Sequence, residues 1–473
     1  ECFLGNSRGL KRCRGKLNAS SACRKNVGVN TMKLYDWNAL RPKEQIDLLK
    51  RPALSNDSLV KERVSEIIKE VQLNGDRALI SLTKELDSVN LSNISVPFEE
   101  IQQAEASLGA ADKNAIQEAA KNITRFHEAQ LPKPIAVETA PGVYCERITR
   151  AISDVGLYVP AGNAPLPSTA LMLGIPAMLA GCSRVILCSP PQANGMINAA
   201  VLYAAKICNI SIIFKIGGAQ AIAAMAYGTE SIPKVSKIFG PGNTWVTAAK
   251  AQVDQDPAGA AREMPAGPSE IMVIADEEAN PNFVASDLLS QAEHGPDSQV
   301  MLISTNKTVL LEVIEAIEQQ KQKLSRRAII QKSLENSRAI LVDNLDTALF
   351  VANKYAPEHL MLQVKEPKAA LEKVQAAGSV FLGPWAPESI GDYCSGTNHV
   401  LPTYGYARSY SSLGVTDFLR SMTVQTLTSK GLQQIGGIAE RLADLEGLDA
   451  HRQAVRLRLE TLEDSGWNKS NEN

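Results

Sequence analysis

The strongest constraint on the fold is an alternation of short apolar strands with helices, which begins at residue 154. The predicted strands are 154–159, 184–188, 211–215, 270–275, 299–304 and 339–342. The predicted helices are 168–180, 196–207, 219–226, 283–294, 309–322 and 345–355. Strands that are apolar throughout and separated by helices are typical of parallel sheets buried on both faces. The sequence therefore predicts an α/β fold with two Rossmann-like parallel-sheet domains.

The chain has 473 residues, more than one ordinary hydrophobic core accommodates. Three further helices are predicted upstream of the strands, at 60–86, 98–108 and 113–130. We expect a leader (1–33), a small N-terminal arm (34–57), a first α/β domain (58–150 together with 269–412), a second α/β domain (151–268) and a helical C-terminal segment (413–473).

The leader differs in charge from the rest of the chain. Residues 1–33 hold eight basic side chains and one acidic one, whereas the remaining residues hold 41 basic and 50 acidic side chains. A basic, acid-poor start without an apolar core is typical of an organelle transit peptide. A disordered tail, or a translation start at Met32, stays open as an alternative on composition alone.

Composition also argues against two classes of partner. The longest apolar stretch, 170–180, is shorter than the roughly 20 residues that a membrane helix needs, so no membrane span is expected. The net charge of −2 gives no reason to expect nucleic acid.

Two of the five histidines lie in patterns that can carry chemistry. Gln291 and His294 are three residues apart at a predicted helix end, so both lie on one face and offer an amide oxygen and an imidazole to a zinc ion. Glu358 and His359 are adjacent and could supply two proton-transfer groups. Taken alone, the pattern at His294 more often marks a capping or surface histidine. The Glu358–His359 pattern alone more often marks two solvated polar groups. His127, among helix-surface residues, is predicted to be solvated.

A glycine-rich polar run, 388–399, contains Asp392 and His399 and indicates a ligand-binding loop. The standard dinucleotide fingerprint GxGxxG does not occur in the sequence. In the nearest glycine pair, Gly240 and Gly242, a tryptophan replaces the third glycine. Pattern alone therefore does not demonstrate NAD binding.

Eight strings resemble those of the histidinol dehydrogenase family, in the same order along the chain. They are GLYVPAG (156–162), KIGGAQAIAA (215–224), FGPGNTWV (239–246), GPSE (267–270), DLLSQAEHGPDSQV (287–300), KYAPEHL (354–360), ESIGDYCSGTNHVLPT (388–403) and EGLDAH (446–451). The resemblance covers about residues 34–466. It implies the oxidation of L-histidinol to L-histidine through L-histidinaldehyde, with NAD and one zinc ion per subunit, at the end of histidine biosynthesis.

The resemblance also implies roles for individual residues. His359 would take the alcohol proton, and Glu358 would activate water. The implied zinc ligands are Gln291, His294, Asp392 and His451. The implied substrate contacts are Ser269, Gln291, His294, His359, Asp392, Glu446 and His451, and the implied NAD contacts are Tyr158, Gln220 and Asn243. His399 is expected near the site, without an assigned role.

Family members form intertwined homodimers, so the resemblance implies that segment 413–473 is a dimerisation segment. Glu446 and His451 would then reach the active site of the partner subunit. Plant members are plastid proteins, which together with the leader predicts a chloroplast location, with the mitochondrion as the alternative.

Two other functions compete with the dehydrogenase. One is a zinc hydrolase with the same metal ligands and Glu358 as the base for water. The other is a non-catalytic metabolite-binding or scaffold protein. The ordered motifs, with the Glu-His pair and all four ligands retained, favour the dehydrogenase.

Overall fold

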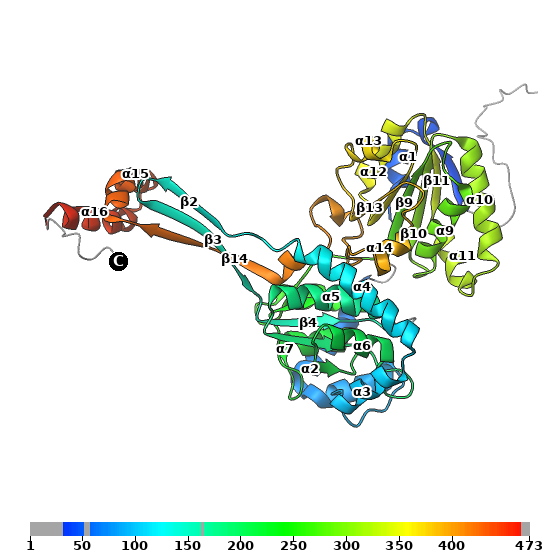
Figure 1. Cartoon of the computed structure of the whole chain (residues 1–473), viewed down its shortest axis with the longest axis horizontal. Coiled ribbons are helices and arrows are strands. Elements are labelled where there is room, and N and C mark those ends of the chain that lie inside the picture. Colours follow the sequence, from blue (N-terminus) through cyan, green and yellow to red (C-terminus); the bar gives the residue numbers. More distant parts are fainter. Residues whose placement is uncertain (1–31, 52–56, 162–164, 465–473) are drawn as a thin grey trace, which may run out of the picture.

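The computed structural model describes residues 32–51, 57–161 and 165–464. Figure 1 shows two bodies, each built around a sheet, and a long arm that leaves one of them and carries helices at its tip. The predicted leader lies outside the described residues except for its last two positions. Within the described ranges, no helix combines the length and apolar character that crossing a bilayer requires.

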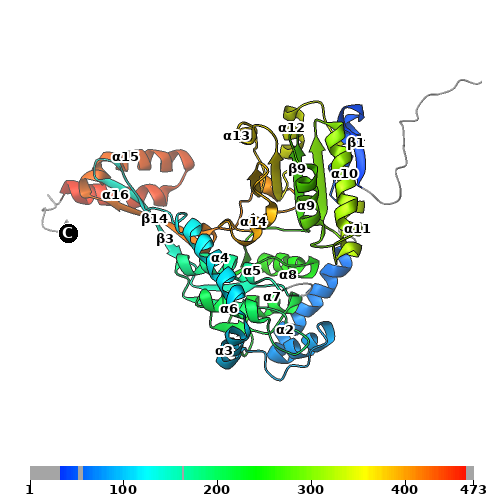
Figure 2. The same cartoon turned by 45° about the vertical axis from the view of Figure 1, so that its right-hand side comes forward.

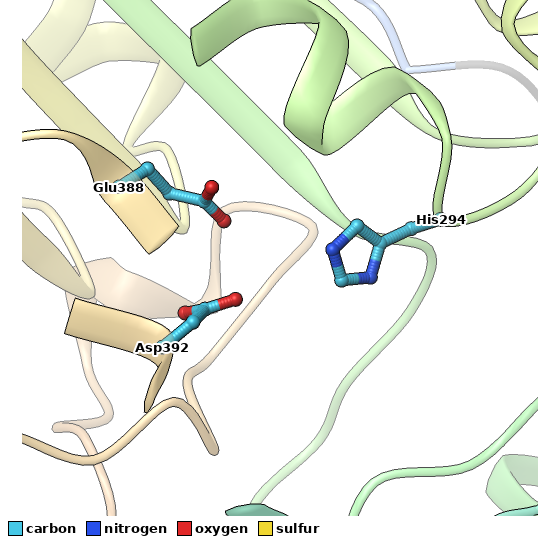
Figure 3. A group of neighbouring side chains, drawn as sticks. All are labelled: His294, Glu388 and Asp392. Atoms are coloured by element: carbon cyan, nitrogen blue, oxygen red, sulfur yellow. The ribbon is translucent and has the colours of Figure 1, made fainter. Parts of the chain in front are cut away.

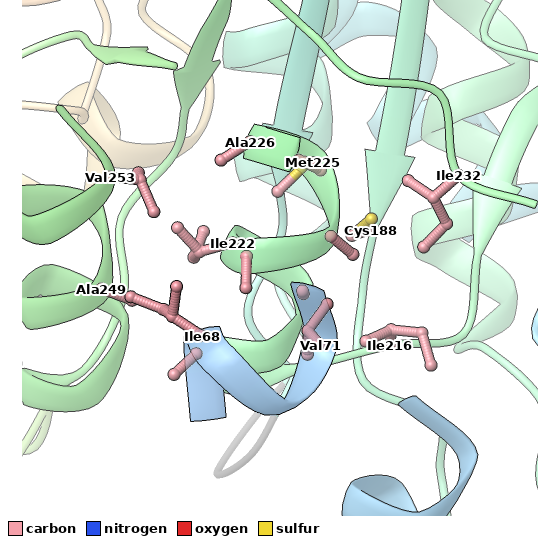
Figure 4. Close-up of a cluster of buried hydrophobic side chains, with 14 of the residues drawn as sticks. Ile68, Val71, Cys188, Ile216, Ile222, Met225, Ala226, Ile232, Ala249 and Val253 are labelled. Atoms are coloured by element: carbon pink, nitrogen blue, oxygen red, sulfur yellow. The ribbon is translucent and has the colours of Figure 1, made fainter. Parts of the chain in front are cut away.

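The first body contains a five-stranded parallel sheet of order β6-β5-β4-β7-β8. Its strands are β4 (Asp154–Tyr158), β5 (Arg184–Cys188), β6 (Ile212–Phe214), β7 (Lys237–Phe239) and β8 (Ala261–Arg262). One face is covered by α2 (Asp57–Leu86), α7 (Gly218–Tyr227) and α8 (Thr244–Gln255), whose apolar side chains form the cluster in Figure 4. The other face is covered by α3 (Phe98–Ser107), α4 (Ala110–Glu128), α5 (Pro167–Ala180) and α6 (Ala199–Ile207).

The second body contains a six-stranded parallel sheet of order β1-β11-β10-β9-β12-β13. Its strands are β1 (Lys33–Asp36), β9 (Glu270–Ala275), β10 (Gln299–Ser304), β11 (Arg338–Leu341), β12 (His359–Gln363) and β13 (Ser379–Leu382). Helices α9 (Pro281–Ala292), α10 (Lys307–Lys321) and α11 (Arg327–Glu335) pack on one face. Helices α1 (Pro42–Leu48), α12 (Leu345–Tyr355) and α13 (Pro367–Leu371) pack on the other, and α14 (Glu388–Tyr393) follows β13.

The arm is a three-stranded antiparallel sheet of order β14-β3-β2. It consists of β2 (Ile135–Ala140), β3 (Val143–Ala151) and β14 (Leu419–Leu427), and it leads to α15 (Ser429–Glu446) and α16 (Asp449–Asp464). Figures 1 and 2 both place α15 and α16 far from the two parallel sheets.

The predicted fold class is confirmed, but the grouping of segments differs from the expected one. Helices α2, α3 and α4, expected to join the domain of residues 269–412, pack instead on the five-stranded sheet. Residues 135–151 form the arm rather than part of a sheet domain, and β1 of the expected N-terminal arm is an edge strand of the six-stranded sheet. Amphipathic periodicity shows that a helix has an apolar face, but not which sheet covers it.

The two sheets meet through opposite edges. Gly240 follows the carboxyl end of β7, whereas Glu358 precedes the amino end of β12, and both line one cavity. The carboxyl edge of the five-stranded sheet therefore faces the amino edge of the six-stranded sheet. Ligand binding at a carboxyl edge is usual for parallel sheets; chemistry at the amino edge of the other sheet is not.

Candidate functional site

Glu358 and His359 are held together by the backbone of the neighbouring strand. The two side chains are buried at the start of β12, beside Glu270 at the start of β9. The Glu270 amide donates to Glu358 Oε2 at 2.7 Å, and His359 Nδ1 lies 3.1 Å from the Glu270 carbonyl oxygen. A carbonyl can only accept, so Nδ1 carries hydrogen and donates. Among the described residues, His359 Nε2 has no hydrogen-bond partner.

Carboxylates surround the free side of the His359 ring. Its Nε2 lies 3.5 Å from Asp392 Oδ1 and 4.0 Å from Glu388 Oε1. Burial alone would lower the pKa of His359, but Glu358, Asp392 and Glu388 outweigh burial and raise it to about 10. Burial raises the pKa of Glu358 to about 8. The pair thus favours its protonated forms until a cation engages the neighbouring carboxylates.

Beside this pair lies a group of side chains able to hold a metal ion. His294, Glu388 and Asp392 each offer one ligand atom, and these atoms lie within 4.8 Å of one another. Figure 3 shows the two carboxylates of α14 facing the imidazole of His294, which lies just beyond the end of α9. Gln291, in the last turn of α9, is fully buried, and neither of its amide atoms has a partner in the described part of the chain.

This arrangement fits a divalent cation. The buried amide of Gln291 and the buried Glu388 Oε1, which have no hydrogen-bond partner among the described residues, would be costly without a ligand. Imidazole nitrogen, carboxylate oxygen and amide oxygen are acceptable zinc ligands. Of the four residues that the sequence implied as ligands, His294 and Asp392 come together in one chain, and Gln291 lies in the last turn of α9, three residues before His294.

The fourth implied ligand does not. His451 in α16 and Glu446 at the end of α15 are exposed at the tip of the arm. Figure 1 shows that tip and the helices α9 and α14 in separate parts of the molecule. Within one chain, therefore, neither residue reaches the cluster.

Glu388 was not among the predicted site residues. It is 1% exposed; Ser290 Oγ donates to its Oε2 at 2.8 Å, and its Oε1 has no partner within the described ranges. The only sequence signal was its spacing four residues before Asp392, which puts both carboxylates on one face of a helix.

His399 joins the site to the five-stranded sheet body. Its Nδ1 donates to the Asp392 carbonyl oxygen at 2.9 Å, so its Nε2 accepts from Thr169 Oγ1, also at 2.9 Å. His399 thereby fixes the backbone that carries Asp392. The prediction for His127 was wrong: it is fully buried and donates from Nδ1 to the Ile123 carbonyl oxygen, because this side of α4 faces the body of the protein.

The predicted cofactor contacts lie along the carboxyl edge of the five-stranded sheet. Tyr158 ends β4, Gln220 lies in the first turn of α7, and Asn243 caps α8. The Gly218 amide donates to Tyr158 Oη at 3.1 Å. Gln220 is 1% exposed, and its Oε1 finds no partner among the described residues. Ser269, a predicted substrate contact, lines the cavity together with Glu358.

The buried acids predict how stability depends on pH. Burial raises the pKa of Glu358 and Glu388 to about 8 and that of Asp287 to about 7, so the folded protein binds more protons than the unfolded chain above the ordinary carboxyl pKa. Their stabilising contribution is complete below that value and lost as pH rises to 8. The raised pKa of His359 acts in the same direction up to pH 10.

We therefore expect chelator-treated protein to lose about 2 kcal/mol or more of unfolding free energy between pH 6 and 9. Urea unfolding at each pH measures this loss. Protein loaded with zinc should lose less, because a cation stabilises the ionised carboxylates. A flat pH profile without metal would contradict the prediction.

The fold and site define the chain as an α/β protein with a buried Glu-His pair beside side chains able to hold a metal ion. Comparison with known proteins narrows this class. The family model for histidinol dehydrogenase matches residues 49–459. A histidinol dehydrogenase of Vibrio vulnificus is 52% identical over 431 residues, which is 91% of this chain and 99% of that enzyme. The chain belongs to the histidinol dehydrogenase family.

Two further relatives agree. A histidinol dehydrogenase of Yersinia pestis is 51% identical over 92% of this chain and 97% of its own length. The crystal structure of histidinol dehydrogenase from Elizabethkingia anophelis superposes with a TM-score of 0.87 at 45% identity, covering 92% of this chain and all of that one.

These relatives correct the expected location. They are bacterial enzymes, and bacteria have neither chloroplasts nor mitochondria, so the predicted chloroplast location and its mitochondrial alternative are contradicted. The composition of residues 1–33 misled the prediction because a basic, acid-poor segment is not specific to transit peptides.

Proposed function

We propose that this chain oxidises L-histidinol to L-histidine through the aldehyde, in two successive hydride transfers to NAD. Family membership supports the reaction. The observation that carries the proposal is the buried Glu358–His359 pair, which faces the ligand cluster of α9 and α14. A two-step oxidation of an alcohol to an acid needs one group that removes the hydroxyl proton and one that activates water, and the pair supplies both.

Gln291, His294 and Asp392 would hold one zinc ion, with Glu388 beside them and His451 supplied by a second subunit. Bound there, zinc would act as a Lewis acid and orient the substrate's nitrogen atoms. The unpartnered buried amide of Gln291 supports this assignment.

In this proposal, His359 would take the hydroxyl proton. The Glu270 carbonyl fixes hydrogen on Nδ1, so the proton goes to Nε2 as the carbinol carbon loses its hydride. This role needs a neutral ring. Glu358, Asp392 and Glu388 all raise the pKa of His359, and engagement of Asp392 and Glu388 by a cation would offset two of these three charges and so favour the neutral form.

In this proposal, Glu358 would act on the aldehyde. Glu358 lines the cavity, and its Oε2 accepts a hydrogen bond from the Glu270 amide. As a carboxylate it would remove a proton from water that adds to the aldehyde, giving a hydrate. The hydrate is again an alcohol, so His359 and the same cofactor site would serve the second oxidation.

NAD would lie along the carboxyl edge of the five-stranded sheet, in contact with Tyr158, Gln220 and Asn243. When bound, it supplies the hydride acceptor. The free Oε1 of the buried Gln220 side chain supports a ligand there.

A second copy of the chain would complete the site. Glu446 and His451 lie in a pair of helices that, with the turn between them, exposes Leu442, Leu445 and Leu448, and an exposed apolar surface of this kind marks an interaction site. The arm projects them away from their own cluster, so in a homodimer they would serve the site of the partner.

The absorbance of reduced nicotinamide tests the function directly. With L-histidinol and NAD, the enzyme should form two reduced cofactors per histidinol consumed. A zinc hydrolase or a non-catalytic binding protein would form none.

Replacing Glu358 by glutamine should slow the oxidation of L-histidinaldehyde by about a hundredfold, within the range for loss of a general base. The first oxidation, from histidinol to aldehyde, should fall much less, because His359 remains in place. Single-turnover assays started from each substrate separate the two steps. Equal losses in both steps would show that the pair acts as one unit.

A further inference from the structure

The loop after β7 is held by a buried ion pair. Lys250 in α8 pairs with Glu263, and the two side chains are 8% and 3% exposed. The Gly240 amide donates to Glu263 Oε1 at 2.9 Å, while Lys250 Nζ donates to the Gly240 carbonyl oxygen at 2.9 Å. The ion pair therefore binds both the amide and the carbonyl group of Gly240. A side chain at Gly240 is excluded, since its Cβ would lie 2.1 Å from the Tyr158 carbonyl oxygen.

The contacts with the loop involve only one of the two carboxylate oxygens of Glu263. Its Oε1 makes these contacts, but Oε2 has no hydrogen-bond partner in the described part of the chain and is shielded from solvent. A buried carboxylate oxygen without a donor is costly, and so is burying an ion pair where apolar side chains would pack equally well. Oε2 is therefore suited to accept a hydrogen bond from a ligand.

The cavity beside Glu263 indicates which ligand. The residues that line it include Glu263, Lys250, Gly240, Ser269, Glu358 and His399. Its volume of about 100 Å³ is well below the several hundred Å³ of a complete small-molecule site. It can admit a small ring or a sugar, but not a whole dinucleotide. Because Glu358 lies in the same cavity, the group admitted is the one that reacts.

We propose that Glu263, held in place by Lys250, binds the nicotinamide nucleoside half of the cofactor by accepting a hydrogen bond at Oε2. The donor is an N–H of the carboxamide or a hydroxyl of the adjoining ribose. This inference rests on the proposed function, because it takes NAD as the hydride acceptor. It adds an acidic contact, in the cavity that Glu358 also lines, to the three expected cofactor contacts.

The test is the binding of NAD to zinc-loaded Glu263→Gln, measured by calorimetry. Glutamine keeps an acceptor for Gly240 but turns an N–H toward the ligand's donor, so we expect the Kd for NAD to rise about 10- to 100-fold. The Kd for L-histidinol should change less than twofold. With 3-acetylpyridine adenine dinucleotide, which lacks the carboxamide N–H, the penalty disappears if the carboxamide is the donor and persists if the ribose is.

Two further variants serve as controls for this test. Asp256→Asn removes a carboxylate whose oxygens bond to Tyr227 and the Ala258 amide outside the cavity, and it should bind NAD like the wild type. Should Glu263→Gln fold poorly, the double variant Lys250→Met, Glu263→Gln removes the buried charges together and should show the same loss.

NAD binding within twofold of the wild type, or an equal loss of histidinol binding, would overturn the assignment. If the wild type itself forms no reduced nicotinamide, the proposed function fails. If it does, and the variant binds NAD normally, only the role of Glu263 fails.

Discussion

Replacement of His294 by asparagine is expected to strip most of the zinc from the purified enzyme and, with it, most of the activity, while the fold stays intact. The imidazole, just beyond the end of α9, offers a ligand atom that faces the two carboxylates of α14. The amide of asparagine is shorter and binds zinc more weakly. Loss of a residue that only hydrogen-bonds to a metal ligand lowers metal affinity by about 10- to 100-fold. Loss of a direct ligand should therefore lower the zinc affinity of this site by at least about a hundredfold.

The fold should tolerate the change because His294 is exposed beyond the end of its helix. Elemental analysis gives the zinc content, and urea unfolding in chelator should agree with the wild type within about 0.5 kcal/mol. Glu293→Gln, which removes a carboxylate next to His294, is the matched control and should retain zinc. Unchanged metal content in the His294 variant would contradict its assignment as a ligand.

Strands buried on both faces were predictable from the sequence because, after the first residue, they contain only apolar or small residues. The bounds of β5, β9 and β10 agree with the prediction. Strand β12 was missed because it begins with His359, whose polarity suggested a loop. Strand β14 was missed for the opposite reason: it lies in an exposed antiparallel arm, so its side chains are polar and its segment was expected to be helical.

The site was predictable only in parts. The spacing of Gln291 and His294 placed both at a helix end, as observed, but 34 residues separate Glu358 from Asp392. Only the fold brings Asp392 to within 3.5 Å of His359, next to Glu358. Glu263 carried no motif at all, because its significance lies in contacts with a glycine that precedes it by 23 residues.

Mixing two inactive variants, His294→Asn and His451→Asn, is expected to restore activity. In a homodimer with exchanged arms, each site takes His294 from one chain and His451 from the other. A mixed dimer then has one site with both substitutions and one site with neither. Random exchange makes about half of the dimers mixed, so activity should reach about a quarter of the wild-type value. The measurement is reduced-nicotinamide formation after the variants are unfolded and refolded together.

The matched control mixes His294→Asn with Asp392→Asn. Both residues come from the body of one chain, so every site in a mixed dimer keeps one defect and no activity should return. Recovery in the first mixture and not in the second requires His451 to act across subunits. Only then can a site combine the intact His294 of one chain with the intact His451 of the other. If His451 served its own chain, every site would again carry a defect and the first mixture would stay inactive. Activity in both mixtures would instead show that His294 and Asp392 reach one site from different chains, which would contradict the cluster within one chain.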